Sequence, residues 1–233
     1  MSNSSEKCSC TSFEHDILSN QNNIDLFCSY LSHLSYHSQD FIKNILQHIN
    51  PLYIKFYDAS EKQGFYLETQ YYIFFVFRGT DDALTDFKND LKFWKTSYKD
   101  YDVHTGFFNA FQKVRYQLDT DLSYANTCGK HIIYCGHSMG GALATILCLD
   151  ILPHSLITFG CPRVSSGQNF IDLLSTINSR RYVNKGDIVS GLPQYFLGYT
   201  HHCRNIIRTS NFGNVFKSHY STNYVLAMRE MIK

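Results

Sequence analysis

The 233-residue sequence predicts an α/β fold in which a mostly parallel central sheet is flanked by helices. Strand-like and helix-like stretches alternate through the middle of the chain, and parallel strands joined by helical crossovers need that order. The segment 71–77, YYIFFVF, is apolar on both faces, as expected for a strand buried under helices on both sides of a sheet.

The expected elements follow from the spacing of apolar residues along the chain. A first helix is expected around residues 26–34. Strands are expected at 52–57, 64–68, 71–77, 131–135, 155–159, 180–183 and 202–208, and helices at 107–122, 139–149, 169–177 and 219–231. Because the length fits a single hydrophobic core, residues 1–24 are predicted to be a polar tail and residues 25–233 one domain.

Composition argues against two classes of partner. The net charge is +1 and basic residues form no long block, so nothing favours nucleic-acid binding. The longest apolar run, 71–77, is far shorter than the roughly 20 residues of a membrane helix, so no transmembrane segment is expected.

The first residues lack the apolar core of a signal peptide, which predicts a cytoplasmic or other intracellular protein. Unconventional export or packaging into a particle stays open.

The eight cysteines predict neither a metal site nor a disulfide framework. Three of them lie in apolar stretches and are expected to be reduced core residues: Cys135, Cys148 and Cys161. The pair at 8 and 10 lacks the second ligand pair of a zinc site. The run 201–203, His-His-Cys, falls in a β-like stretch, where adjacent side chains face opposite ways. No metal site is therefore expected.

The segment 132–141, IIYCGHSMGG, holds a Gly-x-Ser-x-Gly motif between an apolar strand and a helix rich in Ala and Leu. The motif is typical of a nucleophile elbow, a sharp turn in which bulkier residues at the glycine positions would collide with neighbouring backbone. Such a turn exposes the hydroxyl of Ser138 and places the backbone N–H of Met139 beside a developing oxyanion. Ser138 is therefore the predicted nucleophile.

A triad built on Ser138 needs an acid and then a histidine, in the chain order of the α/β-hydrolase fold. Three aspartates precede the downstream histidines: Asp150, Asp172 and Asp187. Asp187 follows the strand-like RRYVN in a Lys-Gly-Asp turn, at the carboxyl end of a strand, where α/β active sites are built. Asp187 is therefore the predicted acid. Chain order leaves three histidines open: His201, His202 and His219.

Several blocks of residues, in the same order, resemble the fungal-type class 3 lipases over roughly residues 25–225. The blocks are FRGT at 77–80, HTGF at 104–107, GHSMGGALA at 136–144, TFGCPRV at 158–164, VNKGDIV at 183–189 and LP at 192–193. The resemblance implies an α/β-hydrolase fold with a short helical lid over the active site. The chain departs from the family pattern at Gly191, which stands in the usual proline-rich turn, and in a shorter final segment.

The resemblance also assigns residues to roles. It implies Ser138 as nucleophile, Asp187 as acid and His219, near the C-terminus, as base. Thr80, after Arg-Gly, matches the oxyanion residue, whose backbone N–H would act together with that of Met139. The block around His201 resembles a family segment that is not catalytic.

Between the oxyanion block and the block at 104–107 lies an amphipathic stretch at the family's lid position. Its apolar residues fall close to helical spacing and are expected to contact substrate: Leu84, Phe87, Leu91 and Trp94. An ordinary amphipathic surface helix is the alternative. A lid does not by itself imply fat as the substrate, because some relatives with polar lids are feruloyl esterases.

The sequence thus predicts a serine carboxylic-ester hydrolase, in the first place a triacylglycerol lipase, with an acyl-enzyme intermediate and no cofactor. Its expected partner is an ester or lipid substrate, with transient contact to a lipid surface through the lid. A phospholipase A1, a feruloyl-type esterase or an acyltransferase are alternatives within enzymes. A catalytically silent lipase-like domain that binds protein is the alternative of another class.

Overall fold

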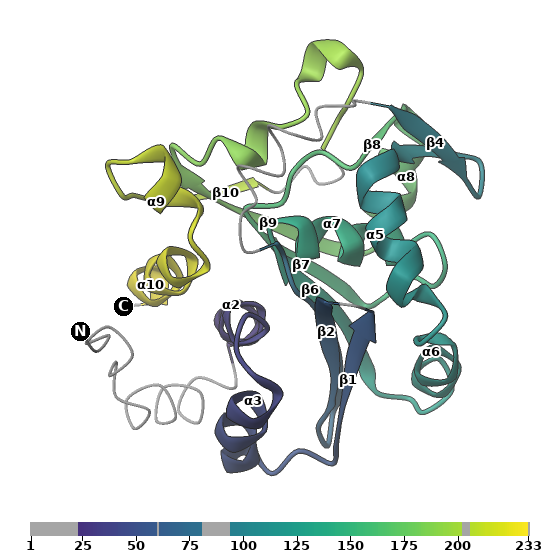
Figure 1. The fold of residues 1–233 in the computed structure, drawn as a ribbon, viewed down its shortest axis with the longest axis vertical. Helices are drawn as coiled ribbons and strands as arrows, with labels where there is room; N and C mark the ends of the chain where they lie inside the picture. The colour runs from purple at the N-terminus through teal and green to yellow at the C-terminus, as the bar shows by residue number, and fades with distance from the viewer. Residues whose placement is uncertain (1–22, 60, 81–93, 202–205, 233) are drawn as a thin grey trace.

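The computed structural model describes residues 23–59, 61–80, 94–201 and 206–232. Its centre is a seven-stranded sheet, with strands in the order β1-β2-β3-β6-β7-β9-β10 (Figure 1). The strands span Tyr53–Ala59 (β1), Glu61–Glu68 (β2), Tyr72–Phe77 (β3), His131–His137 (β6), Ser155–Phe159 (β7), Asn178–Lys185 (β9) and Ile206–Asn211 (β10). From β3 to β10 every neighbouring pair is parallel, whereas β1 and β2 join antiparallel at one edge. The predicted mostly parallel sheet is confirmed.

Helices cover both faces of this sheet. One face carries α2 (Ile24–Leu34), α3 (Gln39–Leu46) and α10 (Ser221–Ile232), whose buried residues share one core cluster. The other carries α5 (Thr105–Arg115), α6 (Asp119–Ala125), α7 (Met139–Leu147) and α8 (Gln168–Ser175), which form a second cluster. A short α9 (Val215–His219) precedes α10, and single 3-10 turns lie at Gln47–Ile49 (η1), Val189–Gly191 (η2) and Tyr195–Leu197 (η3).

Strand β3 shows why its sequence is apolar without interruption. Phe74 and Val76 belong to the cluster beneath α2, whereas Phe75 and Phe77 belong to the cluster beneath α7. All four side chains are buried. A strand with helices on both sides has no face left for polar side chains, as the segment 71–77 predicts.

Several local features differ from the sequence-based expectation. A small antiparallel sheet of β4 (Lys95–Tyr98), β5 (Tyr101–His104) and β8 (Ser165–Ser166) has no counterpart in it, because these strands are short and mostly polar. The helix expected at 107–122 is two helices, α5 and α6, and the last helix is preceded by α9. The polar tail, most of the amphipathic stretch 83–94 and the start of the strand expected at 202–208 lie outside the described residues.

No helix in the described ranges combines the length and apolar character needed to cross a membrane.

The packing of α7 on β3 generates a stability prediction. A methyl group at Gly140 would lie inside contact distance of the Phe77 backbone, whereas one at Gly191 would meet nothing within 4 Å. Gly140→Ala should therefore cost about 1–3 kcal/mol of unfolding free energy through overpacking. The melting temperature should fall by roughly 2–4 °C for each kcal/mol. Gly191→Ala is the control, and equal melting temperatures for the two variants would contradict this packing.

Candidate active site

Ser138 occupies the sharp turn between β6 and α7. Its backbone has φ 58° and ψ −128°, a conformation that costs a residue with a side chain of order 1–3 kcal/mol. Gly136 and Gly140 flank it and approach each other so closely that a methyl group on Gly136 would overlap the Gly140 carbonyl. The glycine pattern is thus explained by backbone crowding. Ser138 itself is fully buried.

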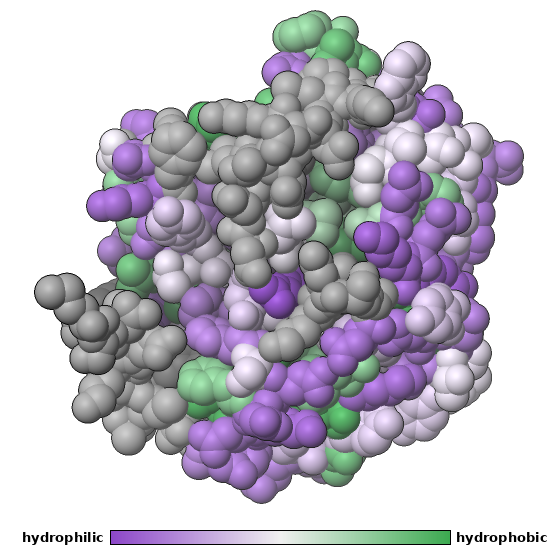
Figure 2. All heavy atoms as spheres, viewed as in Figure 1, coloured by the Kyte–Doolittle hydropathy of each residue, from purple (hydrophilic) through white to green (hydrophobic). Residues whose placement is uncertain are grey.

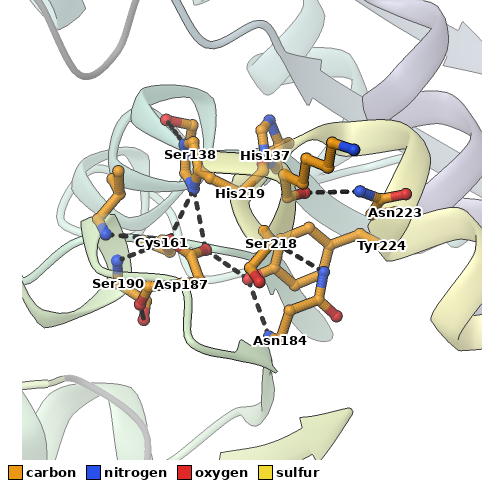
Figure 3. Close-up of polar contacts among 12 residues, drawn as sticks. His137, Ser138, Cys161, Asn184, Asp187, Ser190, Ser218, His219, Asn223 and Tyr224 are labelled. Carbon is orange, nitrogen blue, oxygen red and sulfur yellow. Dashed lines mark hydrogen bonds and ion pairs between the residues drawn. The ribbon is translucent and has the colours of Figure 1, made fainter. Parts of the chain in front are cut away.

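Three buried side chains form a continuous hydrogen-bonded relay behind this turn (Figure 3). Ser138 Oγ lies 2.8 Å from His219 Nε2. On the other side of the ring, His219 Nδ1 lies 2.9 Å from Asp187 Oδ2 and 3.0 Å from Oδ1. The serine follows β6, the aspartate follows β9 and the histidine ends α9, so three distant parts of the chain meet here.

The carboxylate of Asp187 accepts three further hydrogen bonds. The backbone N–H groups of Val189 and Ser190 donate to Oδ1 at 2.9 and 3.4 Å, and the Tyr224 hydroxyl donates to Oδ2 at 2.6 Å. Burial alone raises the pKa of this carboxyl, but the hydrogen bonds and charge of His219 and the Tyr224 hydrogen bond hold the pKa below its usual value. Asp187 is therefore ionised at neutral pH. Because a carboxylate only accepts, His219 carries its proton on Nδ1 and offers Nε2 to the serine.

A second set of contacts holds the backbone of His219. His137 Nε2 donates to the His219 carbonyl oxygen at 2.6 Å, and His137 Nδ1 accepts from the Tyr36 hydroxyl at 2.8 Å. Burial, with a smaller contribution from the nearby His219, lowers the pKa of His137 to about 3. His137 is neutral at neutral pH and, through its hydrogen bond to the backbone carbonyl of His219, fixes the position of His219 beside Ser138.

The segment 78–80 lies directly against the elbow. A methyl group on Gly79 would come within 2.8 Å of the His137 carbonyl oxygen and 3.1 Å of Ser138 Cβ, so only glycine allows this approach. The guanidinium carbon of Arg78 lies 5.5 Å from the centroid of the Tyr36 ring. Gly79 thus lies against the turn that leads into α7, whose first residue is Met139.

Most of the other sequence-predicted residues lie outside the part of the chain that the structure describes. Leu84, Phe87 and Leu91 lie outside the described residues, and so does His202. Trp94 is described and is largely exposed beside the start of β4. In the described ranges, the three cysteines expected in the core are buried: Cys135, Cys148 and Cys161. Those ranges also hold no cluster of three or more His, Cys, Asp or Glu residues suited to a metal ion.

Sequence reasoning missed Tyr36 and Tyr224. Tyr36 lies in the turn after α2, about a hundred residues from the elbow, and Tyr224 is one of 17 tyrosines in the chain. No local pattern distinguishes them, because their partners come from other elements. Only the fold identifies them.

Comparisons with known proteins concern the family and the fold. A family model described as "Lipase (class 3)" matches residues 74–196. A secreted mono- and diacylglycerol lipase from Fusarium solani is 36% identical over 107 residues, 42% of this chain and 32% of the relative. A lipase from Rhizomucor miehei is 31% identical over 144 residues, 55% of this chain and 39% of the relative. The matches therefore span about a third to two fifths of the length of these curated relatives.

Solved structures share the fold. A fungal lipase–inhibitor complex described as a model for interfacial activation superposes with a TM-score of 0.66 at 25% identity. The match covers 82% of this chain and 80% of that one. The α/β-hydrolase prediction is confirmed.

The prediction of a cytoplasmic or intracellular protein is wrong. The Fusarium solani relative is by its name a secreted enzyme. The prediction used only the composition of the first residues, whereas the fold and the site place no constraint on the compartment.

The buried His137 generates a prediction about pH. From about pH 3 to 6.5 the unfolded chain binds a proton at this residue that the folded protein excludes, so stability falls as the pH decreases through this window. His33, with its pKa lowered to about 4 mainly by burial, acts in the same direction.

His137→Gln removes one of these titrations. In a plot of the unfolding free energy against pH, the slope between about pH 4 and 6.5 should become shallower by up to about 1.4 kcal/mol per pH unit. Urea unfolding at a series of pH values measures it, with the exposed His131→Gln as control. A slope unchanged by His137→Gln would contradict a buried neutral imidazole.

Proposed function

The chain belongs to the class 3 lipase family, and on that premise we propose that it hydrolyses carboxylic esters through Ser138, His219 and Asp187. The observation that carries the proposal is the buried relay at the strained turn, with Ser138 Oγ 2.8 Å from His219 Nε2 and the opposite ring nitrogen on an ionised carboxylate. In this arrangement a histidine can remove the serine proton while the imidazolium that forms is stabilised by its partner.

The first half-reaction would form an acyl-enzyme. As Ser138 Oγ bonds to the ester carbonyl carbon, His219 Nε2 takes the hydroxyl proton and the carbonyl oxygen becomes an oxyanion. The backbone N–H groups of Thr80 and Met139 are the proposed donors to this oxyanion, supported by the close packing of the 78–80 segment on the elbow. The tetrahedral intermediate then breaks its bond to the alcohol oxygen, which leaves with the proton from His219.

The second half-reaction would reverse these roles with water. His219 takes a proton from the water as its oxygen bonds to the acyl carbon, and the acid leaves as Ser138 recovers its proton. Asp187 stays ionised throughout, since its hydrogen bonds favour the charged form. Tyr224 is a positioning residue in this scheme: burial, reinforced by Asp187, raises the pKa of its phenol well above the usual value, so it stays a donor to the carboxylate.

Within carboxylic-ester hydrolases, we propose a triacylglycerol lipase that works at a lipid surface. The names of the relatives, a lipase and a mono- and diacylglycerol lipase, support acylglycerols as the substrate class. The similar inhibitor complex supports contact with an interface through the lid residues Leu84, Phe87 and Leu91. The full burial of Ser138 adds a physical reason, because an ester reaches the hydroxyl only after the atoms above it move.

Ser138→Ala tests the nucleophile. Its kcat for p-nitrophenyl butyrate should fall by roughly 10⁶-fold, because the remaining groups cannot form an acyl-enzyme. The melting temperature should stay within a few degrees of wild type. Ser190→Ala, which also borders Asp187 but lacks a contact to the reacting oxygen, is the matched control. Substantial activity in a folded Ser138→Ala protein would contradict the proposal.

Replacing Phe87 and Leu91 together by Ser tests the lid. Exposing such side chains to water costs an estimated ~1.5–3 kcal/mol each, and a lipid surface removes that cost. Wild-type activity on tributyrin should therefore rise abruptly above the solubility limit, and the double variant should flatten the rise. Hydrolysis of soluble p-nitrophenyl acetate serves as the reference for an intact triad. A smooth wild-type curve, unaltered by the substitutions, would favour a plain esterase.

A further inference from the structure

An exposed aromatic turn projects from the connection between β9 and β10. Tyr195 and Phe196 in η3 expose 74% and 83% of their surface, and Leu197 is partly exposed. The connection rises at the top of Figure 1, and hydrophobic spheres cap the same projection in Figure 2. Residues 188–200 include no charged side chain. Large apolar side chains left in water at a convex tip need an explanation.

This turn is rigidly attached on both sides. Before it, Arg163 donates from its backbone N–H to the Leu192 carbonyl at 2.6 Å and from its guanidinium to the Pro193 carbonyl at 2.8 Å. After it, the Thr200 N–H donates to the Ser165 carbonyl at 2.9 Å. The turn closes on itself with hydrogen bonds from the Leu197 and Gly198 N–H groups. The exposed rings are therefore presented in a preformed arrangement.

Trp94 lies beside the same turn. The hydroxyl of the buried Tyr199 donates to the Trp94 carbonyl at 3.2 Å, and Lys95 Nζ donates to the Gly198 carbonyl at 3.4 Å. Trp94 exposes 69% of its surface. The start of β4 thus lies against the end of the turn, and the exposed Trp94 stands beside its base.

We propose that Trp94, Tyr195 and Phe196 form a fixed aromatic anchor that inserts into the surface of a lipid aggregate. This inference rests on the proposed function and deepens it, because it names the surface that docks on the substrate phase. Tryptophan and tyrosine favour the boundary between lipid and water, where the ring is apolar and its polar atom stays hydrated. The turn at 188–200 has no charged side chain of its own to bury, and the long side chain of Lys95 beside it can keep its ammonium among the hydrated headgroups.

The shape of the anchor favours a lipid surface over a protein. A stable protein interface buries roughly 1,200–2,000 Å² with a complementary partner surface, whereas the anchor is a single convex turn. A fluid surface needs no matching cavity. The anchor also belongs to the same connection as Asp187, which opens it at the end of β9, so docking would hold the triad near the lipid.

Trp94 is the only tryptophan in the chain, so its fluorescence reports on the anchor directly. The test uses the Ser138→Ala protein with phosphatidylcholine vesicles, which avoids hydrolysis. The emission should shift to shorter wavelength on binding, and vesicles with brominated acyl chains should quench it. In Tyr195→Ser/Phe196→Ser the dissociation constant should rise by about tenfold or more, because two apolar rings no longer leave water.

The matched control is Tyr116→Ser, which removes a ring of similar exposure, 69%, at the far end of α5. It should bind as the parent does, and added salt should weaken neither protein, since the contact is apolar. Absence of a shift and of quenching, or equal binding by the double variant and the control, overturns the anchor. Hydrolysis of p-nitrophenyl acetate by the wild-type chain is measured separately, and its absence would overturn the proposed function instead.

Discussion

The site depends on one buried carboxylate that stays charged. Asp187 is removed from water, which would favour its neutral form, yet it accepts hydrogen bonds from His219, Tyr224 and two backbone N–H groups. These donors outweigh the cost of burial and keep the pKa of the carboxyl low. Once Asp187 is ionised, the tautomer of His219 is fixed and its Nε2 can only accept from Ser138. A neutral Asp187 would no longer determine which nitrogen of the His219 ring carries the proton.

The parallel sheet places these groups. Ser138 and Asp187 follow the carboxyl ends of β6 and β9, and β7 lies between these two strands. His219 comes from the helical C-terminal part, and its backbone is held by the chain of Tyr36 and His137 that begins at α2. The N-terminal helix therefore contributes to the active site although its own residues do not reach the reacting atoms. The strain at Ser138 persists because β3 and α7 pack closely around the turn.

Local signals were enough to predict the sheet, the turn at Ser138 and the position of Asp187 after a strand. The apolar run 71–77 indicates burial on both faces of the sheet, and the glycines around Ser138 indicate backbone crowding within a few residues. Asp187 follows a recognisable strand. The choice of His219 among three histidines needed the family resemblance, because chain order alone does not fix distance in space. Tyr36, Tyr224 and the exposed turn at 195–197 were not predicted, since their importance depends on partners distant in sequence. The small strands β4, β5 and β8 were missed because they are short and mostly polar.

The most direct test of this account is the rate at which a fluorophosphonate modifies Ser138, followed by intact mass and peptide mapping. The reagent reports activation of the serine without any assumption about the natural ester. Asp187→Asn should slow the modification by roughly 10³–10⁴-fold, because an amide cannot fix the His219 tautomer. Asp172→Asn, a change on the surface of α8, should leave the rate unchanged. Equal rates for the two variants, or a label on a serine other than Ser138, would contradict the account.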